Sequence, residues 1–156
     1  MTLTVELDAL HAVAPEIWEM MLGVSMTFVA DGTHEWGEMA RTITGLVTVV
    51  GDWTGAITVQ STTTAARKFA ALMFGADDPD ELPLEEVRDA HAELVNMVGG
   101  NMKNMVEGKC TLGIPTVTEG VGYEVRLPRT QPTQQFVYDC DGDAVMVVVY
   151  EPVSRS

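Results

Sequence analysis

The sequence predicts a mixed fold of helices and antiparallel strands, built from two related halves that share one sheet. Apolar residues recur at helical spacing in segments 6–22 and 84–107. Runs of β-branched and aliphatic residues follow each segment, and short turn-forming stretches separate them as in hairpins. The first helix also repeats part of the second in sequence, so duplication of a unit made of a helix and strands would explain this order.

The composition is that of a globular chain with an acidic surface. Hydrophobic residues make up 46% of the 156 residues and charged residues 21%, which suits one domain, residues 1–156, with a full core. Nine Lys and Arg against 23 Asp and Glu give a formal net charge of −14. Such a surface repels phosphate backbones and anionic lipid, so we expect neither nucleic acid nor a membrane surface as a partner.

Several features predict a cytoplasmic protein. The first ten residues lack the basic start and apolar centre of a signal peptide. The longest strongly apolar run, residues 144–150, is too short to span a bilayer. Cys110 and Cys140 have neither metal-ligand spacing nor a second pair, so we interpret them as reduced structural thiols.

The first half is predicted to contain one helix and three strands. Helix 6–22 carries Pro15, which must kink the helix or restart it, and Gly23 ends the helix. The strands predicted from aliphatic and β-branched runs are residues 24–30, 42–50 and 56–60, the last two joined by a turn at 51–55.

The second half follows a short helix and an acidic loop. Ser and Thr capping candidates open a helix at 61–74, and Gly75 closes it. An acidic loop with two prolines, 76–83, leads into the long helix 84–107. The remaining strands are predicted at 116–127, 135–140 and 143–150, and the end of the chain, 151–156, is predicted to fray.

The long helix carries the most informative polar face in the sequence. Asp89, Glu93 and Asn96 belong to a polar stripe that occupies an arc of roughly 100° at 3.6 residues per turn, and Gly99 and Gly100 follow one turn later. Each glycine inside a helix costs about 0.5–1 kcal/mol relative to alanine, so the pair indicates that another group comes close to the backbone. Two other interpretations remain open: the polar face is solvated surface, and the glycines serve tight packing on the sheet.

The helix of the first half contains an echo of this motif. Residues 16–23, EIWEMMLG, resemble residues 93–100, ELVNMVGG. The first copy has Glu19 where the second has Asn96 and lacks an aspartate four residues before its first glutamate. If the motif is functional, only the second copy is expected to work.

No self-contained catalytic centre is visible in the sequence. Phosphate-binding loops, dinucleotide fingerprints and nucleophile elbows are absent. His91 falls on the apolar face of its helix and is expected to be a hydrogen-bonded structural residue. The acidic loop 76–83 lacks the glycine and ligand rhythm of a calcium site. Glu93 and Asn96 are therefore expected to act on a partner that brings its own chemistry.

An ordered set of short stretches carries a family resemblance. These stretches are Asp89-x-x-x-Glu93-x-x-Asn96 with Gly100 and Lys103 behind it, segment 55–61 before a helix that ends at 72–75, and segment 112–120 after the long helix. In this order they are similar to the CheX/CheC/FliY family of chemotaxis phosphatases, most of all to its single-site CheX type. The resemblance implies a two-layer fold, with long helices on one face of an antiparallel-rich sheet of about six strands in pseudo-twofold αβββ halves.

The resemblance also implies an activity, the removal of phosphate from the aspartyl phosphate of a CheY-like receiver domain in two-component signalling. Carried over to this sequence, Asn96 orients the attacking water and Glu93 pairs with the lysine of the receiver. Asp89, Gly99 and Gly100 are supporting motif positions. The receiver supplies the phosphoaspartate and Mg²⁺, so this chain is expected to bind no cofactor or metal of its own.

The resemblance also implies a way of forming dimers, and two alternative functions remain open. CheX-like proteins dimerise through sheet edges, and strand 144–150 is a candidate edge if it lies outermost. The first alternative function is a non-catalytic adaptor that binds or sequesters a receiver domain. The second is a component of the flagellar switch, which is disfavoured because the chain ends soon after the fold and carries no added switch-binding domain.

Overall fold

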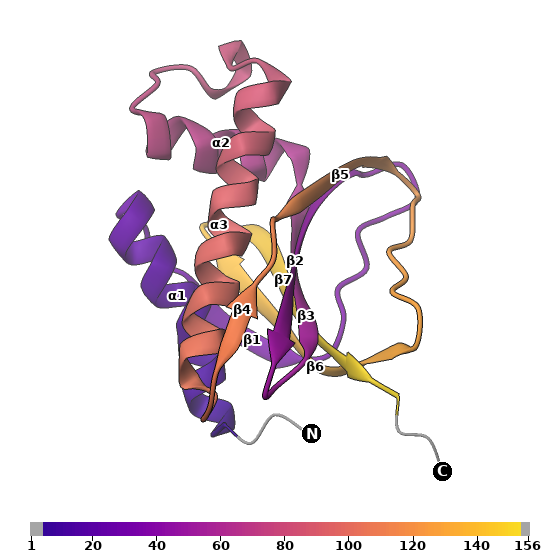
Figure 1. The fold of residues 1–156 in the computed structure, drawn as a ribbon. Helices are drawn as coiled ribbons and strands as arrows, with labels where there is room; N and C mark the ends of the chain where they lie inside the picture. The colour runs from indigo at the N-terminus through magenta and orange to yellow at the C-terminus, as the bar shows by residue number, and fades with distance from the viewer. Residues whose placement is uncertain (1–4, 154–156) are drawn as a thin grey trace.

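The computed structural model describes residues 5–153, in which helices cover one face of a seven-stranded antiparallel sheet (Figure 1). This confirms the two-layer fold, with one strand more than the six expected. α3 runs along the sheet, α1 lies beside it, and α2 lies at the end where α3 begins (Figure 1). The elements are α1 (Leu7–Leu22), β1 (Thr27–Asp31), β2 (Arg41–Gly51), β3 (Gly55–Thr62), α2 (Thr63–Phe74), a 3₁₀ turn (Pro79–Glu81), α3 (Leu84–Met105), β4 (Cys110–Leu112), β5 (Thr116–Val121), β6 (Thr130–Cys140) and β7 (Asp143–Pro152).

The sheet order relates the two halves by a pseudo-twofold axis. The strands run β1-β6-β7-β3-β2-β4, and β5 also pairs with β2. Exchanging β1 with β4 and β5, β2 with β6, and β3 with β7 gives the same order in reverse. Each half gives its first strand to the other half, because β1 pairs with β6 while β4 and β5 pair with β2. The predicted halves, each a helix followed by strands, are therefore confirmed, with α2 inserted between them.

The last strand is central, so the condition under which it was a candidate sheet edge is not met. β7 pairs with β6 on one side and with β3 on the other. Val145, Val147 and Val149 point into the core under the helices and are fully buried. The edges within the described residues are β1 on one side and β4 with β5 on the other. An aliphatic strand of this kind is typical of a sheet centre, where both neighbours shield its backbone.

Two other strand predictions need correction. The three-residue strand β4 was not predicted, because so short a segment has no readable alternation. The strand expected at 116–127 ends at Val121, because Gly122 takes a φ of 66° and turns the chain out of the sheet. The end predicted to fray, 151–156, begins inside β7, which continues to Pro152, and residues 154–156 lie outside the described part of the chain.

Pro15 lies inside α1 without ending it. A proline has no backbone N–H, so the carbonyl of His11, four residues earlier, loses its helical donor. The hydroxyl of Tyr138 on β6 donates to that carbonyl at 2.9 Å. The helix therefore runs unbroken to Leu22, rather than restarting at Pro15, and ends as predicted at Gly23 with a φ of 68°.

The main core lies between the helices and the sheet. Trp18 of α1 and Leu94 and Val98 of α3 are fully buried against Ile57 of β3 and Phe136 of β6. A smaller apolar cluster joins α2 to the first turns of α3 at one end of the sheet. α3 is thus packed against the sheet, α1 and α2, and its remaining face is open to solvent.

Candidate functional site

The predicted site residues lie on the solvent side of α3. This helix begins after Pro83 and ends two residues before the predicted position 107. Asp89 and Glu93 are exposed, and Asn96 is half-buried. The opposite face is buried, as the apolar spacing predicts, through Val87, Ala90, His91, Leu94, Val95, Val98, Gly99 and Met102.

Glu93 and Asn96 present unused hydrogen-bonding groups to solvent. Neither side chain, nor that of Asp89, has a hydrogen bond or ion pair within residues 5–153. Glu93 and Asn96 are three residues apart, which places them roughly 4.5 Å apart along the helix axis and on the same side of it. A carboxylate only accepts hydrogen bonds, whereas a primary amide both accepts and donates. The two groups can therefore engage one external object in complementary ways.

The two glycines of the motif have different surroundings. A Cβ at Gly99 would lie 2.4 Å from Cγ1 of Val47 on β2, so the lack of a side chain there lets α3 pack closely on the sheet. A Cβ at Gly100 would meet only Leu112, at an ordinary 3.8 Å. For Gly99 the structure supports the packing interpretation. Gly100 is not required by the core, and its half-buried backbone lies one turn after Asn96.

A second glycine contact fixes the position of α3 on β2. A Cβ at Gly45 would lie 2.8 Å from Cγ1 of Val95 and 3.1 Å from Cδ2 of His91. Gly45 of the strand and Gly99 of the helix thus create close approach at two points roughly one turn apart. Glu93 lies on the side of this section away from the sheet and Asn96 on its flank, so these contacts hold the stretch of helix that carries both.

The connection from β4 to β5 carries an exposed apolar residue and begins next to α3. Leu112 approaches both Gly99 and Gly100, and two residues later Ile114 is 89% exposed. The connection is anchored because the backbone N–H of Gly113 donates to the carbonyl of Thr48 at 2.7 Å. Segment 112–120 carries part of the family resemblance, but Ile114 was not predicted as a surface residue, since the exposure of an isoleucine depends on the tertiary fold.

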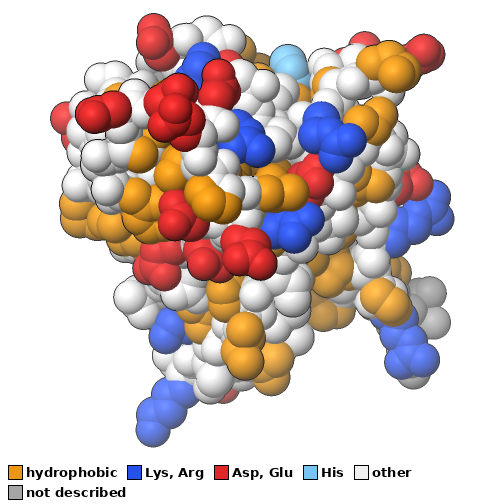
Figure 2. All heavy atoms as spheres, turned by 90° about the horizontal axis from the view of Figure 1, so that it is seen from above, with side chains coloured by type: hydrophobic (Ala, Val, Ile, Leu, Met, Phe, Trp, Pro, Cys, Tyr) orange, Lys and Arg blue, Asp and Glu red, His pale blue; other side chains and the backbone are white. Residues whose placement is uncertain are grey.

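The end of the molecule where α3 begins is acidic. Figure 2 views this end and shows Asp and Glu side chains grouped beside a few Lys and Arg side chains. The acidic residues of the loop and of the first turn of α3 are Asp77, Asp78, Asp80, Glu81, Glu85 and Glu86. Of the nearby cations, Arg88 approaches Glu119 at 3.9 Å. A partner that docks along α3 therefore meets negative potential, which favours a basic group at the point of contact.

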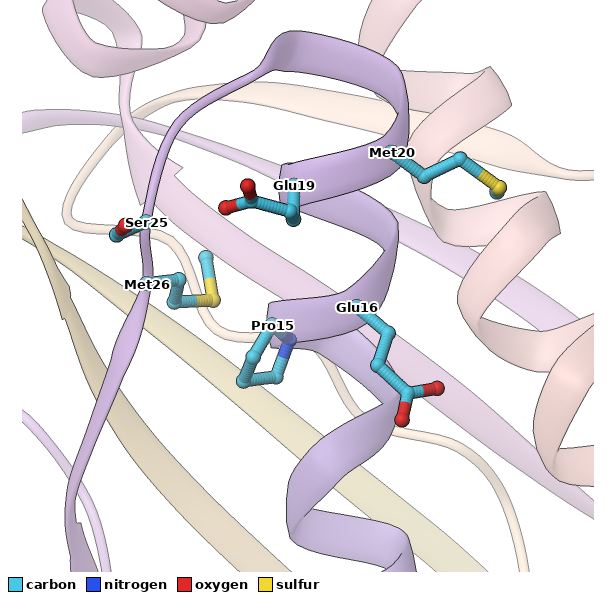
Figure 3. Close-up of a pocket in the computed structure, with 6 residues that line it drawn as sticks. All are labelled: Pro15, Glu16, Glu19, Met20, Ser25 and Met26. Carbon is cyan, nitrogen blue, oxygen red and sulfur yellow. The ribbon is translucent and has the colours of Figure 1, made fainter.

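The equivalent surface on α1 has a different arrangement. Glu16 and Glu19 line an open pocket of about 380 Å³ with Pro15, Met20, Ser25 and Met26. Figure 3 shows the carboxylate of Glu19 pointing toward Ser25, while that of Glu16 points away from it. α1 also ends at Gly23, whereas α3 continues past the equivalent Gly100. The first copy thus lacks both the amide and the long continuous helix of the second.

His91 is a buried and hydrogen-bonded residue, as predicted. Nε2 of His91 lies 2.8 Å from the carbonyl oxygen of Val59, and burial lowers the pKa of His91 to about 4 against the opposing effect of that hydrogen bond. Both cysteines are free, and burial raises the pKa of the Cys140 thiol. Residues 5–153 contain no group of three or more His, Cys, Asp or Glu side chains placed to hold a metal. No helix in the same range is long and apolar enough to cross a membrane.

The sequence model of the family described as chemotaxis phosphatase CheX matches residues 43–141, well over half of the chain. The chain belongs to the CheX family. The matched range contains all of α3, including Asp89, Glu93 and Asn96. A search of curated proteins finds no significant match to the chain.

Solved structures of CheX and FliY proteins share the fold. CheX from Vibrio vulnificus superposes with a TM-score of 0.75 at 18% identity, covering 93% of this chain and 95% of that one. A chain of the CheX–CheY–BeF₃–Mg²⁺ complex from Borrelia burgdorferi gives 0.74 at 16% identity, covering 94% and 97%. FliY from Thermotoga maritima gives 0.60 at 12% identity, covering 90% and 83%. The common architecture is thus retained at low sequence identity.

Proposed function

We propose that this CheX-family chain is a phosphatase that removes phosphate from the aspartyl phosphate of a CheY-like receiver domain. The observation that carries the proposal is the pair of Glu93 and Asn96, side by side on the solvent face of α3 and unpaired within the described residues. Membership in the CheX family supports the activity. The Borrelia burgdorferi complex, which joins CheX to CheY with BeF₃ and Mg²⁺, supports the choice of partner.

The primary amide of Asn96 suits the task of orienting water. Its carbonyl oxygen can accept a hydrogen bond from a water molecule while its NH₂ group donates to a second group. Unlike a carboxylate, it adds no negative charge beside the anionic phosphoryl group. Hydrolysis forms a bond between the water oxygen and phosphorus and breaks the bond between phosphorus and the aspartyl oxygen. The aspartate leaves as a carboxylate, and the two protons of the water go to the phosphate product and the solvent.

The receiver domain supplies the remaining chemistry in this proposal. It carries the phosphoaspartate, the Mg²⁺ and a lysine, and Glu93 pairs with that lysine to hold the complex in register. Phosphoryl transfer depends mainly on positioning and electrostatic stabilisation, so a chain that adds only an oriented water can accelerate it. The acidic end of α3 favours an approach that brings the lysine toward Glu93.

The surroundings of the pair fit a docking surface. A Cβ at Gly100 would meet only Leu112, so the half-buried backbone there leaves room for close approach one turn after Asn96, and the exposed Ile114 lies two residues after Leu112. Asp89 lies one turn before Glu93 on the same exposed face and is proposed to support the site electrostatically. We also propose that the chain acts in the cytoplasm as a homodimer formed through a sheet edge, which in this fold is β1 or β4 with β5.

The test compares the decay of a phosphorylated receiver domain with the wild-type chain and with Asn96→Ala. We expect Asn96→Ala to fold and bind normally yet to lose roughly 10²-fold of the stimulated rate, as for a water-positioning group. Asn101→Ala is the matched control, because Asn101 is an exposed asparagine on the same helix but lies roughly 140° around the axis. Wild-type activity in Asn96→Ala would overturn the assignment. Binding without accelerated decay by the wild type would favour the adaptor function instead.

A further inference from the structure

A cavity of about 420 Å³ lies on the face of the sheet opposite the helices. Its floor is formed by neighbouring strands of the sheet centre, including Thr58 and Gln60 of β3 and Met146 and Val148 of β7. Its outer wall comes from the segments 32–40 and 122–129, which lie on the side of the sheet away from the helices, at the right of Figure 1. The cavity is therefore separate from α3 and from the pair Glu93 and Asn96.

The cavity lies on the pseudo-twofold axis of the fold. Segment 32–40 joins β1 to β2, and segment 122–129 joins β5 to β6, so the two walls are equivalent parts of the two halves. The floor is the central pair, β3 and β7, which the axis relates. Both halves thus hold their connections away from the sheet at the same place, which encloses a space instead of packing side chains into it.

The lining combines flat rings with primary amides. Trp36 from one wall and Tyr123 from the other supply aromatic surfaces, and Tyr150 adds a third at the floor. Gln60 and Gln135 bring amides from strands on either side of β7. This combination offers stacking to a planar ring and donors and acceptors to its edge.

Hydrogen bonds hold part of the lining in place while leaving capacity free. The Tyr123 hydroxyl lies 2.7 Å from the Thr44 hydroxyl and accepts from the Thr42 hydroxyl at 3.1 Å. Nε2 of Gln60 donates to Thr42 at 3.1 Å, and its Oε1 has no partner within residues 5–153. The amide of Gln135 is likewise unpaired within that range. A ligand can therefore use both amides without breaking this network.

The charge of the lining disfavours anions. No Lys or Arg lines the cavity, and its single acidic residue, Glu124, is exposed and pairs with Arg126 at 3.3 Å. The net charge of −14 adds to the repulsion of phosphate groups. The lining therefore holds no permanently charged cation to compensate a phosphate or carboxylate, and its one basic side chain is the imidazole of His34, which contacts the ring of Trp36.

We propose that this cavity is a binding site for an uncharged planar heterocycle of nucleobase or nucleoside size, held by ring stacking and by the amides of Gln60 and Gln135. Ligand pockets typically enclose about 300–1,000 Å³, so a volume of about 420 Å³ suits such a molecule. The site shares β2 with α3, since Thr44 faces the cavity and Gly45 lies against Val95 on the other face. Binding is nevertheless measured without a receiver domain, so the result of this test does not depend on the proposed phosphatase activity.

The test is a titration of the ¹⁵N-labelled full chain with uracil, thymidine and adenosine, followed by amide chemical shifts in NMR spectra. We expect at least one probe to give saturable shifts around Thr44, Gln60 and Gln135, with a dissociation constant of about 1 mM or tighter. Adenosine monophosphate is the charged control and is expected to bind at least tenfold more weakly than adenosine. Absence of saturable shifts with all three neutral probes, or equal binding of the monophosphate, overturns the proposal.

Variants identify the site of binding. Gln60→Leu and Gln135→Leu each remove an amide while keeping a similar shape and are expected to weaken binding roughly tenfold, about 1.4 kcal/mol per lost interaction. Gln131→Leu is the matched control, because Gln131 is exposed on β6 outside the cavity. Met146→Trp is expected to fill the cavity and abolish binding. If it does not fold, the two glutamine variants decide, and unchanged affinity in both contradicts the site.

Discussion

Alanine substitutions at Gly99 and Gly100 distinguish the packing of α3 on the sheet from the proposed contact of α3 with a partner. At Gly99 the new methyl group would lie 2.4 Å from Cγ1 of Val47, a buried β-branched side chain that cannot rotate away. Overpacking of this kind costs about 1–3 kcal/mol, and the better helix propensity of alanine offsets about 0.5–1 kcal/mol. The net loss of about 1 kcal/mol lowers Tm by about 2–4 °C in a chain of this size.

At Gly100 the same substitution has the opposite expected effect on stability. The new methyl group meets Leu112 at 3.8 Å, which is ordinary contact. The gain in helix propensity of about 0.5–1 kcal/mol therefore raises Tm by about 1–4 °C. Under the proposed function, the methyl group also occupies surface beside Asn96, so the more stable variant is expected to be the poorer phosphatase.

Thermal unfolding followed by far-UV circular dichroism gives the stabilities, and the decay of a phosphorylated receiver domain gives the activities. Well below its Tm, Gly99→Ala is expected to keep most of the stimulated rate, because its methyl group points into the core. Equal stabilities for the two variants would refute the packing argument. Full activity in Gly100→Ala would refute the argument that its bare backbone serves the partner.

Three further predictions concern single side chains. His91 stays neutral in the folded chain down to a pKa of about 4, whereas the unfolded chain takes up a proton below about 6.5. This contribution to stability is therefore complete above pH 6.5, and the free energy of unfolding falls by up to about 3 kcal/mol as the pH drops toward 4. Urea unfolding at several pH values should show a shallower fall for His91→Gln than for the wild type. Tyr138→Phe removes the donor to the His11 carbonyl and is expected to cost about 1–3 kcal/mol in the same assay, and an unchanged midpoint would show that the carbonyl finds another donor. Glu93→Ala is expected to raise KM for the phosphorylated receiver roughly tenfold with a smaller change in kcat, and unchanged saturation would argue against the ion pair with the receiver's lysine.

Local patterns in the sequence were sufficient to predict the helices and the hairpins. The three helices follow apolar spacing, and two of them end at glycines with positive φ, Gly23 and Gly75. The hairpin of β6 and β7 turns at Asp141 and Gly142, both with positive φ, as the Asp-Gly pair predicts. These features depend on residues close in sequence, so periodicity and turn chemistry can reveal them.

These local patterns could not predict the contacts between segments that are distant in sequence. The sheet centre is formed by β3 and β7 from different halves, so the position of β7 depends on the exchange of first strands between them. The continuity of α1 across Pro15 depends on Tyr138, more than a hundred residues later. Neither pairing leaves a mark in local sequence, which is why β7 remained a candidate edge and a restart at Pro15 stayed open.

The sequence was sufficient to predict where the candidate residues lie on the helix, but not their surroundings. Helical periodicity places Asp89, Glu93 and Asn96 on one face, and the structure has them there. The different roles of Gly99 and Gly100 depend on how α3 rotates against Val47, which only the fold reveals. The exposure of Ile114 was missed for the same reason, because an isoleucine is expected to be buried unless the fold shows otherwise.

The central claim is that this chain turns over phosphorylated receiver domains rather than holding them. Its most direct test adds a small substoichiometric amount of the chain to a phosphorylated CheY-like receiver with Mg²⁺ and follows the phosphate to completion. The proposed function predicts that the entire receiver population is dephosphorylated faster than it decays alone, and that Asn96→Ala removes the acceleration. Acceleration limited to one receiver per chain, or none at all, would contradict the claim.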